Sequence, residues 1–268
     1  MKLALWDLPP ADVLRAGFES SGIPNLEVLR ARPEVCAGML LEKKVDAALV
    51  PTTMVLKAAD GFDIIPGIAL STWHYPFAKL VLKGGLRDWP ERIIFDRRAI
   101  QEKLVARIVL HEHYGIQPEF QPTKGNIAEV DEPAVLLSGR ASYRADPEDL
   151  VLDLGREWFE LSNYPMVWGL LVTRREHLAP EQVSAIIETA AKAEEQQQSI
   201  LENLPADSDL FDFIQDDVRV RFDDLATASL TELKRYMFYY NELDDMPDLH
   251  FAEIEEGEDE EDQEEPLV

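Results

Sequence analysis

The sequence predicts an α/β protein, in which short buried strands alternate with helices along the chain. The stretch Val45–Val50 is mostly apolar and stops at Pro51, as a short buried strand does. The stretch 166–172 is uniformly apolar, so we expect a strand that is buried on both faces. Helical patterns, such as the one from Ala11 to Ser20, separate the strands. This alternation is typical of parallel α/β layers.

The remaining elements follow in the same order. In the first helix Val13, Leu14 and Phe18 share one face, and the turn residues at 22–24 end it. The second helix begins at Pro33, whose missing N–H is not needed in a first turn. Further strands are expected at 80–82, 92–95 and 133–138, and further helices at 100–114, 180–204 and 230–243.

The chain is strongly acidic, and part of that charge is concentrated at its end. Its formal net charge is −26 over 268 residues, and residues 251–268 contain ten acidic and no basic side chains. An acidic protein repels nucleic-acid phosphates and anionic lipid, so we expect neither as a partner. The composition of residues 251–268 predicts a disordered, solvating tail. A role for this tail in protein interactions is the alternative.

The same composition favours the cytoplasm. No run of about 18 apolar residues is present, so we expect no membrane insertion. The start of the chain reaches Asp7 without the apolar core of a secretory signal. The single cysteine, Cys36, excludes an internal disulfide and fits a reducing compartment. The oligomeric state is left open.

Three blocks of sequence carry a resemblance to a known family. Residues 41–52 read LEKKVDAALVPT, residues 153–158 read DLGREW and residues 161–169 read LSNYPMVWG. In order and spacing they are similar to the GELDVALVPS, DLG-x-x-W and TGLPFVFA segments of the menaquinone-biosynthesis family of the futalosine route. The best-known member of that family is chorismate dehydratase. The resemblance spans nearly the whole chain except the acidic tail.

This resemblance implies a two-lobed fold of the type 2 periplasmic-binding-protein kind, with two strands that cross between the lobes at a hinge. Leu80–Leu82 and Val167–Val172 would be the crossing strands. One lobe would comprise residues 1–82 and 166–250, the other residues 83–165, followed by the tail 251–268. A small carboxylate would bind in the cleft between the lobes, where helix N-termini and polar groups converge.

The resemblance also implies a function, a lyase of menaquinone biosynthesis that removes water from chorismate. Three cleft motifs of the family are altered here: Ser-Tyr-Leu-Asn reads DLPP at 7–10, Ser-Arg-Thr-Ser reads AIQE at 99–102, and Gly-Asp reads GR at 139–140. Glu102 would repel an anion, whereas nearby Arg98 and the introduced Arg140 could attract one. A non-catalytic small-molecule binding protein on the same fold is therefore the alternative function.

Candidate site residues follow from strand ends and from the aligned motifs. Asp7 is either a general base or the cap of the first helix, and Arg140 binds a ligand carboxylate or pairs with an acid. His74 is either a titrating group or structural. The full set of expected ligand contacts is Thr52, Thr53, Ser71, Thr72, His74, Arg98, Gln101 and Arg140, with Asp7 as the catalytic residue.

No cofactor or metal is expected. The sequence contains no Gly-rich phosphate loop, no nucleophile elbow and no paired cysteines. His111 and His113 lie two positions apart on a predicted helix, so their side chains diverge and cannot share one ion.

Overall fold

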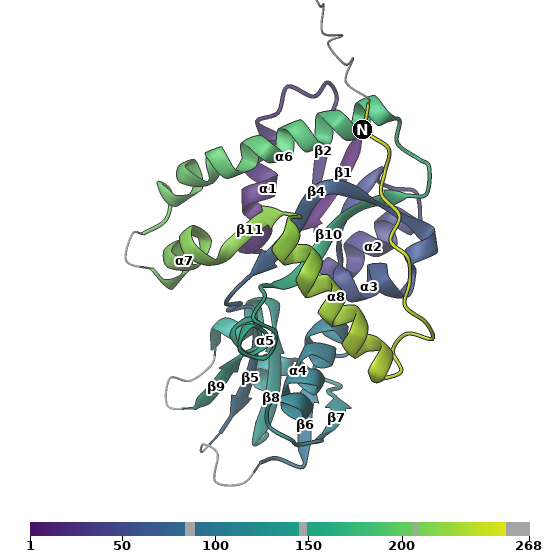
Figure 1. Cartoon of the computed structure of the whole chain (residues 1–268). Coiled ribbons are helices and arrows are strands. Elements are labelled where there is room, and N and C mark those ends of the chain that lie inside the picture. The colour runs from purple at the N-terminus through teal and green to yellow at the C-terminus, as the bar shows by residue number, and fades with distance from the viewer. Residues whose placement is uncertain (84–88, 145–148, 206–207, 256–268) are drawn as a thin grey trace, which may run out of the picture.

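Two β-sheets, each with its own helices, make up the protein (Figure 1). The computed structural model describes residues 1–83, 89–144, 149–205 and 208–255. We call the six-stranded sheet with its helices the first lobe, and the five-stranded sheet with its helices the second lobe. The α/β class predicted from the sequence is confirmed.

The first lobe is built on a mixed sheet of order β11-β4-β10-β3-β1-β2. Its parallel part joins β1 to β2 and β3, whereas β10 lies antiparallel between β3 and β4. Eight of the nine residues of β10 are buried, as the uniformly apolar run predicted. The strands are β1 (Lys2–Trp6), β2 (Glu27–Ala31), β3 (Ala47–Pro51), β4 (Phe62–Thr72), β10 (Met166–Arg174) and β11 (Val218–Arg221).

The second lobe contains a smaller sheet of order β7-β6-β8-β5-β9. Here β6 runs parallel to β7 and β8, and β5 lies antiparallel between β8 and β9. The strands are β5 (Ala78–Leu82), β6 (Arg92–Phe95), β7 (Glu119–Pro122), β8 (Ala134–Ser138) and β9 (Leu150–Asp153). Helices α4 (Ile100–Glu112) and α5 (Leu154–Ser162) pack against each other beside this sheet.

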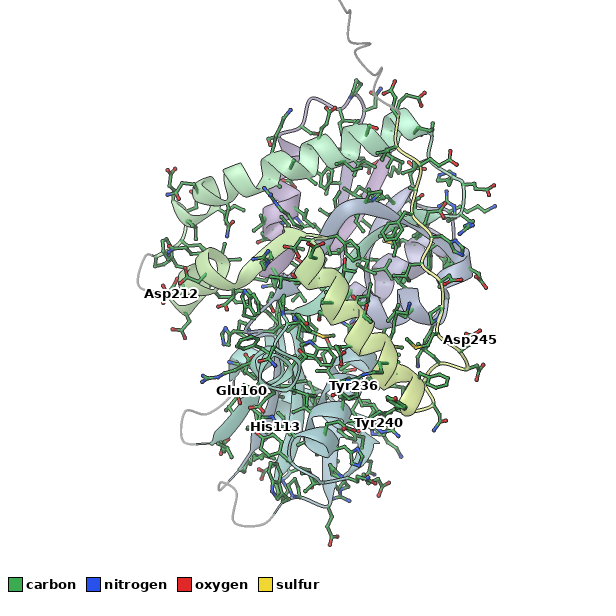
Figure 2. The ribbon with its side chains drawn as sticks, viewed as in Figure 1. His113, Glu160, Asp212, Tyr236, Tyr240 and Asp245 are labelled. Carbon is green, nitrogen blue, oxygen red and sulfur yellow. The ribbon has the colours of Figure 1, made fainter. Side chains whose placement is uncertain are left out.

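The first lobe carries most of the helices. The long helix α6 packs against α1 so closely that a Cβ added at Gly17 would lie 2.6 Å from the Cβ of Ala193. Helix α8 packs on β10 and then runs toward the second lobe, where Tyr240 follows its last turn (Figures 1 and 2). These helices are α1 (Asp12–Glu19), α2 (Pro33–Leu41), α3 (Thr52–Lys57), α6 (Pro180–Leu201), α7 (Asp209–Asp212) and α8 (Asp224–Tyr239).

Two short segments join the lobes. Residues 73–77 connect β4 to β5, and residues 163–165 connect α5 to β10. The expectation that Leu80–Leu82 crosses between the lobes is wrong, because these residues pair with β8 and β9 inside the second sheet. Val167–Val172 likewise lies wholly in the first sheet, next to the crossing at 163–165. Division into independent domains stays a prediction.

The end of the described chain pairs with the first sheet. The carbonyl of His250 accepts from the N–H of Ile64 at 2.8 Å, and the N–H of Ala252 donates to the carbonyl of Ile64 at 2.9 Å. Phe251 therefore belongs to the fold rather than to the predicted tail, and residues 256–268 lie outside the described residues. No helix within the described part of the chain combines the length and apolarity that a bilayer crossing requires.

Candidate ligand cleft

A cavity of about 380 Å³ lies between the lobes. Its first-lobe wall comes from the residues that follow β1 and β3 and from the start of α2, and its second-lobe wall comes from the loops after β6 and β8 and the first turn of α4. These are the carboxyl ends of strands, where ligands of open α/β sheets bind. Trp168 and Tyr75, which stack with ring centroids 4.1 Å apart, also line the cavity.

Two of the three arginines that line the cavity pair with acids from their own segment. The guanidinium of Arg32 lies 3.1 Å from the carboxylate of Glu34 at the start of α2. Arg98 binds Asp96 through two side-chain hydrogen bonds, of which the Nε–Oδ1 bond measures 2.9 Å. The positive charge of each arginine is thus largely balanced within its own lobe.

The third arginine connects the two lobes. Nη2 of Arg140, in the turn after β8, lies 3.4 Å from Oδ1 of Asp7, which follows β1. Asp7 does not cap the first helix, because the N-cap of α1 is Ala11, which makes no side-chain hydrogen bond. Both side chains are at least half exposed, so this contact lies at the open side of the cavity.

Gln101 joins the lobes a second time, in a buried position. Its Oε1 accepts a hydrogen bond from the N–H of Thr53 at 3.0 Å, and its Nε2 donates to the carbonyl of Trp168 at 2.7 Å. The side-chain amide of α4 therefore holds α3 and β10 of the first lobe. Gln101 lines the cavity, but both ends of its amide are already occupied, and its contact with a ligand stays a prediction.

The four predicted hydroxyls divide into two groups. Thr53 lines the cavity, and its buried Oγ1 has no hydrogen-bond partner among the described residues. Thr52 and Ser71 are also buried without a partner for their hydroxyls, but they lie outside the cavity lining. Thr72 accepts a hydrogen bond from Nε1 of Trp168 at 2.9 Å. Only Thr53 of the four is therefore placed to contact a ligand in this cavity.

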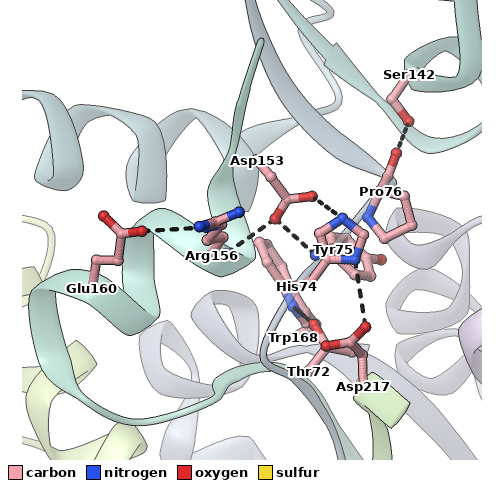
Figure 3. Close-up of polar contacts among 10 residues, drawn as sticks. All are labelled: Thr72, His74, Tyr75, Pro76, Ser142, Asp153, Arg156, Glu160, Trp168 and Asp217. Atoms are coloured by element: carbon pink, nitrogen blue, oxygen red, sulfur yellow. Dashed lines mark hydrogen bonds and ion pairs between the residues drawn. The ribbon is translucent and has the colours of Figure 1, made fainter. Parts of the chain in front are cut away.

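His74 lies outside the cavity, in the segment that connects the sheets (Figure 3). Its Nε2 lies 3.1 Å from Oδ2 of Asp153, at the end of β9, and its Nδ1 lies 3.5 Å from Oδ2 of Asp217, just before β11. The hydrogen bond that the imidazole donates to Asp217, with the charge of Asp153, raises the pKa of His74 above its ordinary value, against the effect of burial. We call these three residues the hinge cluster, because Asp153 belongs to the second lobe and Asp217 to the first.

Asp153 also organises the backbone around the hinge cluster. Its Oδ1 accepts from the N–H of Tyr75 at 2.8 Å and from the N–H of Arg156 at 3.0 Å, which caps the first turn of α5. Burial raises the pKa of Asp153, while the charge of His74 opposes that rise. The motif that reads DLGREW thus encodes a helix cap and a hinge contact.

Comparison with known proteins assigns this chain to a family. A family model described as menaquinone biosynthesis matches residues 1–239. The chain belongs to the menaquinone-biosynthesis family. Membership agrees with the resemblance carried by the three sequence blocks, and those blocks now have structural places: β3 with the start of α3, the capped start of α5, and β10.

Solved structures confirm the two-lobed fold. Protein AF1704 from Archaeoglobus fulgidus is similar with a TM-score of 0.70 and 16% identity, over 90% of this chain and 98% of that one. The Candida albicans CA3427 gene product is described as having the generic periplasmic binding protein fold. It is similar with a TM-score of 0.62 and 10% identity, over 97% of this chain and 98% of that one. The aliphatic sulphonate binding protein SsuA from Escherichia coli is similar with a TM-score of 0.59 and 12% identity, over 92% of this chain and 94% of that one. At these identities the likeness shows the fold alone.

Sequence reasoning missed the most unusual charged group of the cavity as a candidate. Glu102, in the first turn of α4, lines the cavity, and burial raises its pKa to about 7, with further contributions from the charges of Glu34 and Asp96. From the sequence alone, Glu102 is expected only to repel an anion. A carboxyl group that is half neutral near pH 7 can also donate a proton or a hydrogen bond.

One group among the described residues has the geometry to hold a metal ion. Candidate ligand atoms of His113, Glu157 and Glu160 lie within 4.8 Å of one another, at the end of α4 and on α5. Figure 2 labels His113 and Glu160. Glu157 already accepts a hydrogen bond from Tyr114 at 2.8 Å, and Glu160 pairs with Arg156 at 3.2 Å. None of these residues lines the cavity.

Proposed function

We propose that the protein binds a small carboxylate-bearing molecule in the cavity between its lobes and removes water from chorismate, as chorismate dehydratase does. One observation carries the proposal: in a chain of the menaquinone-biosynthesis family, three arginines from both lobes line one interlobe cavity. Its volume of about 380 Å³ lies in the usual range for small-molecule sites. The starts of α2 and α4, neither of which has a side-chain cap, add favourable dipoles for an anion.

The reaction requires a base beside the substrate ring. The base takes a proton from a ring carbon, and the electrons of that C–H bond form the new ring double bond as the C–O bond to the hydroxyl breaks. The protonated base gives its proton to the departing hydroxyl, which leaves as water. Asp7 is our candidate base, because its carboxylate lines the cavity next to Arg140, which is suited to bind a substrate carboxylate. The substrate's own carboxylate is the alternative base.

The test is a turnover assay. Purified protein is mixed with chorismate, and the loss of chorismate absorbance is followed together with the aromatic product. We expect turnover that falls at least about tenfold in Asp7→Asn, since general-base catalysis typically contributes about 100-fold or more. Arg92→Gln is the matched control, because Arg92 pairs with Glu132 on the surface and does not line the cavity. Absence of turnover at high enzyme concentration rules the dehydratase out.

A second candidate is a non-catalytic binding protein on the same fold. It is favoured by the pairing of every cavity arginine with an acid, including the pairing of Asp7, the candidate base, with Arg140. In this case chorismate or another carboxylate raises the melting temperature without any chemical change. In either case we propose a cytoplasmic location, which a buried free cysteine and the family's biosynthetic role support.

A further inference from the structure

Glu102 differs from the other charged residues of the cavity in its lack of an ion pair with any described residue. Among the described residues that line the cavity, it is the charged side chain with no ion pair, whereas Asp7, Glu34 and Asp96 each have an arginine. The next residue of α4, Lys103, directs its ammonium over the ring of Phe95, 5.6 Å from the centroid. No described cation therefore neutralises Glu102.

Two groups that attract an anion, the N-terminus of α4 and Arg98, lie close to Glu102 in the chain and line the same cavity. Ala99, the N-cap of α4, makes no side-chain cap hydrogen bond, and residues 99–102 all line the cavity together with Arg98. Thr53, whose N–H donates to Gln101, lines the same cavity, and its buried hydroxyl has no partner among the described residues. A carboxylate drawn to these donors comes up against Glu102.

Two carboxylates that meet in a partly buried site cannot both remain ionised without a large free-energy penalty. We propose that Glu102 takes up one proton when a carboxylate enters the cavity, and that the resulting carboxylic acid donates a hydrogen bond to the bound carboxylate. The proton comes from the solvent, and the ligand stays an anion because ordinary carboxylic acids have pKa values near 4. This inference rests on the proposed carboxylate site and adds how that site accommodates an acidic residue.

The surroundings of Glu102 support the inference. Its pKa is already raised to about 7 by burial and by the charges of Glu34 and Asp96. Arg32 of the first lobe and Arg98 of the second line the same cavity, and each is already bound to its own acid. Asp7 and Arg140 pair with each other at the open side. With its pKa raised to about 7, Glu102 can gain or lose its proton near neutral pH, and a second negative charge shifts that balance toward the protonated form.

The experiment is isothermal titration calorimetry of chorismate, and separately of benzoate, into the full-length protein between pH 6.5 and 8.5. Each pH is measured in two buffers with different ionisation enthalpies, so that the number of protons taken up is obtained. We expect an uptake that approaches one proton at pH 8, and an affinity that falls up to about tenfold per pH unit above neutrality. Glu102→Gln should abolish both effects and bind with pH-independent affinity.

Two control variants separate Glu102 from other groups. Glu119→Gln removes an exposed acid on β7 that does not line the cavity, and His74→Gln removes a histidine whose pKa is raised above its ordinary value. Both should retain the proton uptake of the wild type. If the uptake persists in Glu102→Gln or disappears in His74→Gln, Glu102 is not the group that is protonated.

The outcomes distinguish this inference from the proposed function. Proton-coupled binding without turnover overturns the dehydratase and supports the inference. Turnover with binding that is independent of pH and takes up no proton overturns the inference alone. Absence of binding by both chorismate and benzoate at every pH overturns the carboxylate site and the inference with it.

Discussion

The hinge cluster and the cavity hold acidic side chains in opposite circumstances. In the hinge cluster, Asp153 and Asp217 flank an imidazole, and Asp153 also accepts from two backbone N–H groups. In the cavity, Glu102 has a raised pKa and no cationic partner among the residues that the structure describes. The acids of the hinge cluster thus have partners within the protein, whereas Glu102 has none among the described residues, which makes its charge available to respond to a bound molecule.

The largest expected effect concerns the close approach of backbone beside the hinge cluster. A Cβ added at Gly155 would lie 2.7 Å from the backbone nitrogen of Tyr75 and 2.9 Å from the carbonyl carbon of His74. Because backbone rather than a flexible side chain must move, Gly155→Ala should lower the free energy of unfolding by about 3 kcal/mol, measured by urea denaturation. The matched helical control is Gly38→Ala, which meets no atom within 4 Å and should be neutral or stabilising. Equal stabilities of the two variants would contradict a tightly packed hinge.

Removing the shared acceptor of the hinge cluster should have the next largest effect. Asp153→Ala leaves the N–H of Tyr75 and the first turn of α5 without their partner, and should lower the free energy of unfolding at pH 7 by about 2 kcal/mol. Asp153→Asn keeps an acceptor oxygen and should lose less. For comparison, Asp223→Ala removes the N-cap of α8, with an expected loss of about 1 kcal/mol. A loss no greater than that of Asp223→Ala would mean that Asp153 is only a helix cap.

Removing the carboxylate of Glu102 should stabilise the protein, in contrast to removing that of Asp153, because the ionised form of Glu102 destabilises the ligand-free protein. Its folded pKa of about 7 lies above the ordinary value of 4.5, so the folded state binds more protons between these values and stability is lost as pH rises through them. Glu102→Gln should therefore be more stable than the wild type at pH 8 by about 1–2 kcal/mol, and equally stable at pH 4. Melting temperatures across this range provide the measurement, and a variant that is less stable at pH 8 would show that Glu102 has a stabilising partner.

The smallest effect is expected from the histidine of the hinge cluster. The raised pKa of His74 means that its stabilising contribution is present at low pH and is lost as pH rises from the ordinary value of 6.5 through the folded value. His74→Gln should remove that decline. Because the side chain is 43% exposed, the difference should stay below about 1 kcal/mol. A pH profile identical to that of the wild type would show that the hinge cluster does not hold a charged imidazole.

Much of the fold could be predicted because its signals are local. The apolar run at 166–172 became β10, and the stretch that ends at Pro51 became β3. The longest strand, β4, was missed because Pro66 and Gly67 interrupt it and look like a turn. The structure places them at a register shift between β4 and β10, with Gly67 at a φ of +77°, which a glycine accommodates. A bulge of this kind is set by the neighbouring strand, which the local sequence does not reveal.

Part of the candidate site could be predicted because its signals are also local. Asp7, Thr53, Arg98, Gln101 and Arg140 line the cavity, since residues at strand ends and helix starts share one edge. Thr52, Ser71, Thr72 and His74 do not line it, because a residue's position along the chain does not fix the direction of its side chain. The pairing of each arginine with an acid, and the isolation of Glu102, depend on segments from two lobes that meet only after folding.

The pairing of residues 250–252 with β4 determines how the acidic tail should be studied. β11 covers one stretch of that strand's edge, and the bridge at Phe251 protects the next. A truncation that starts at residue 251 would expose unpaired backbone on a sheet edge and invite aggregation that has nothing to do with the tail. A stop codon after Glu255 instead keeps residues 250–252 paired with β4 and removes the acidic residues that follow. The effect of the acidic tail can then be measured apart from the protection of the sheet edge.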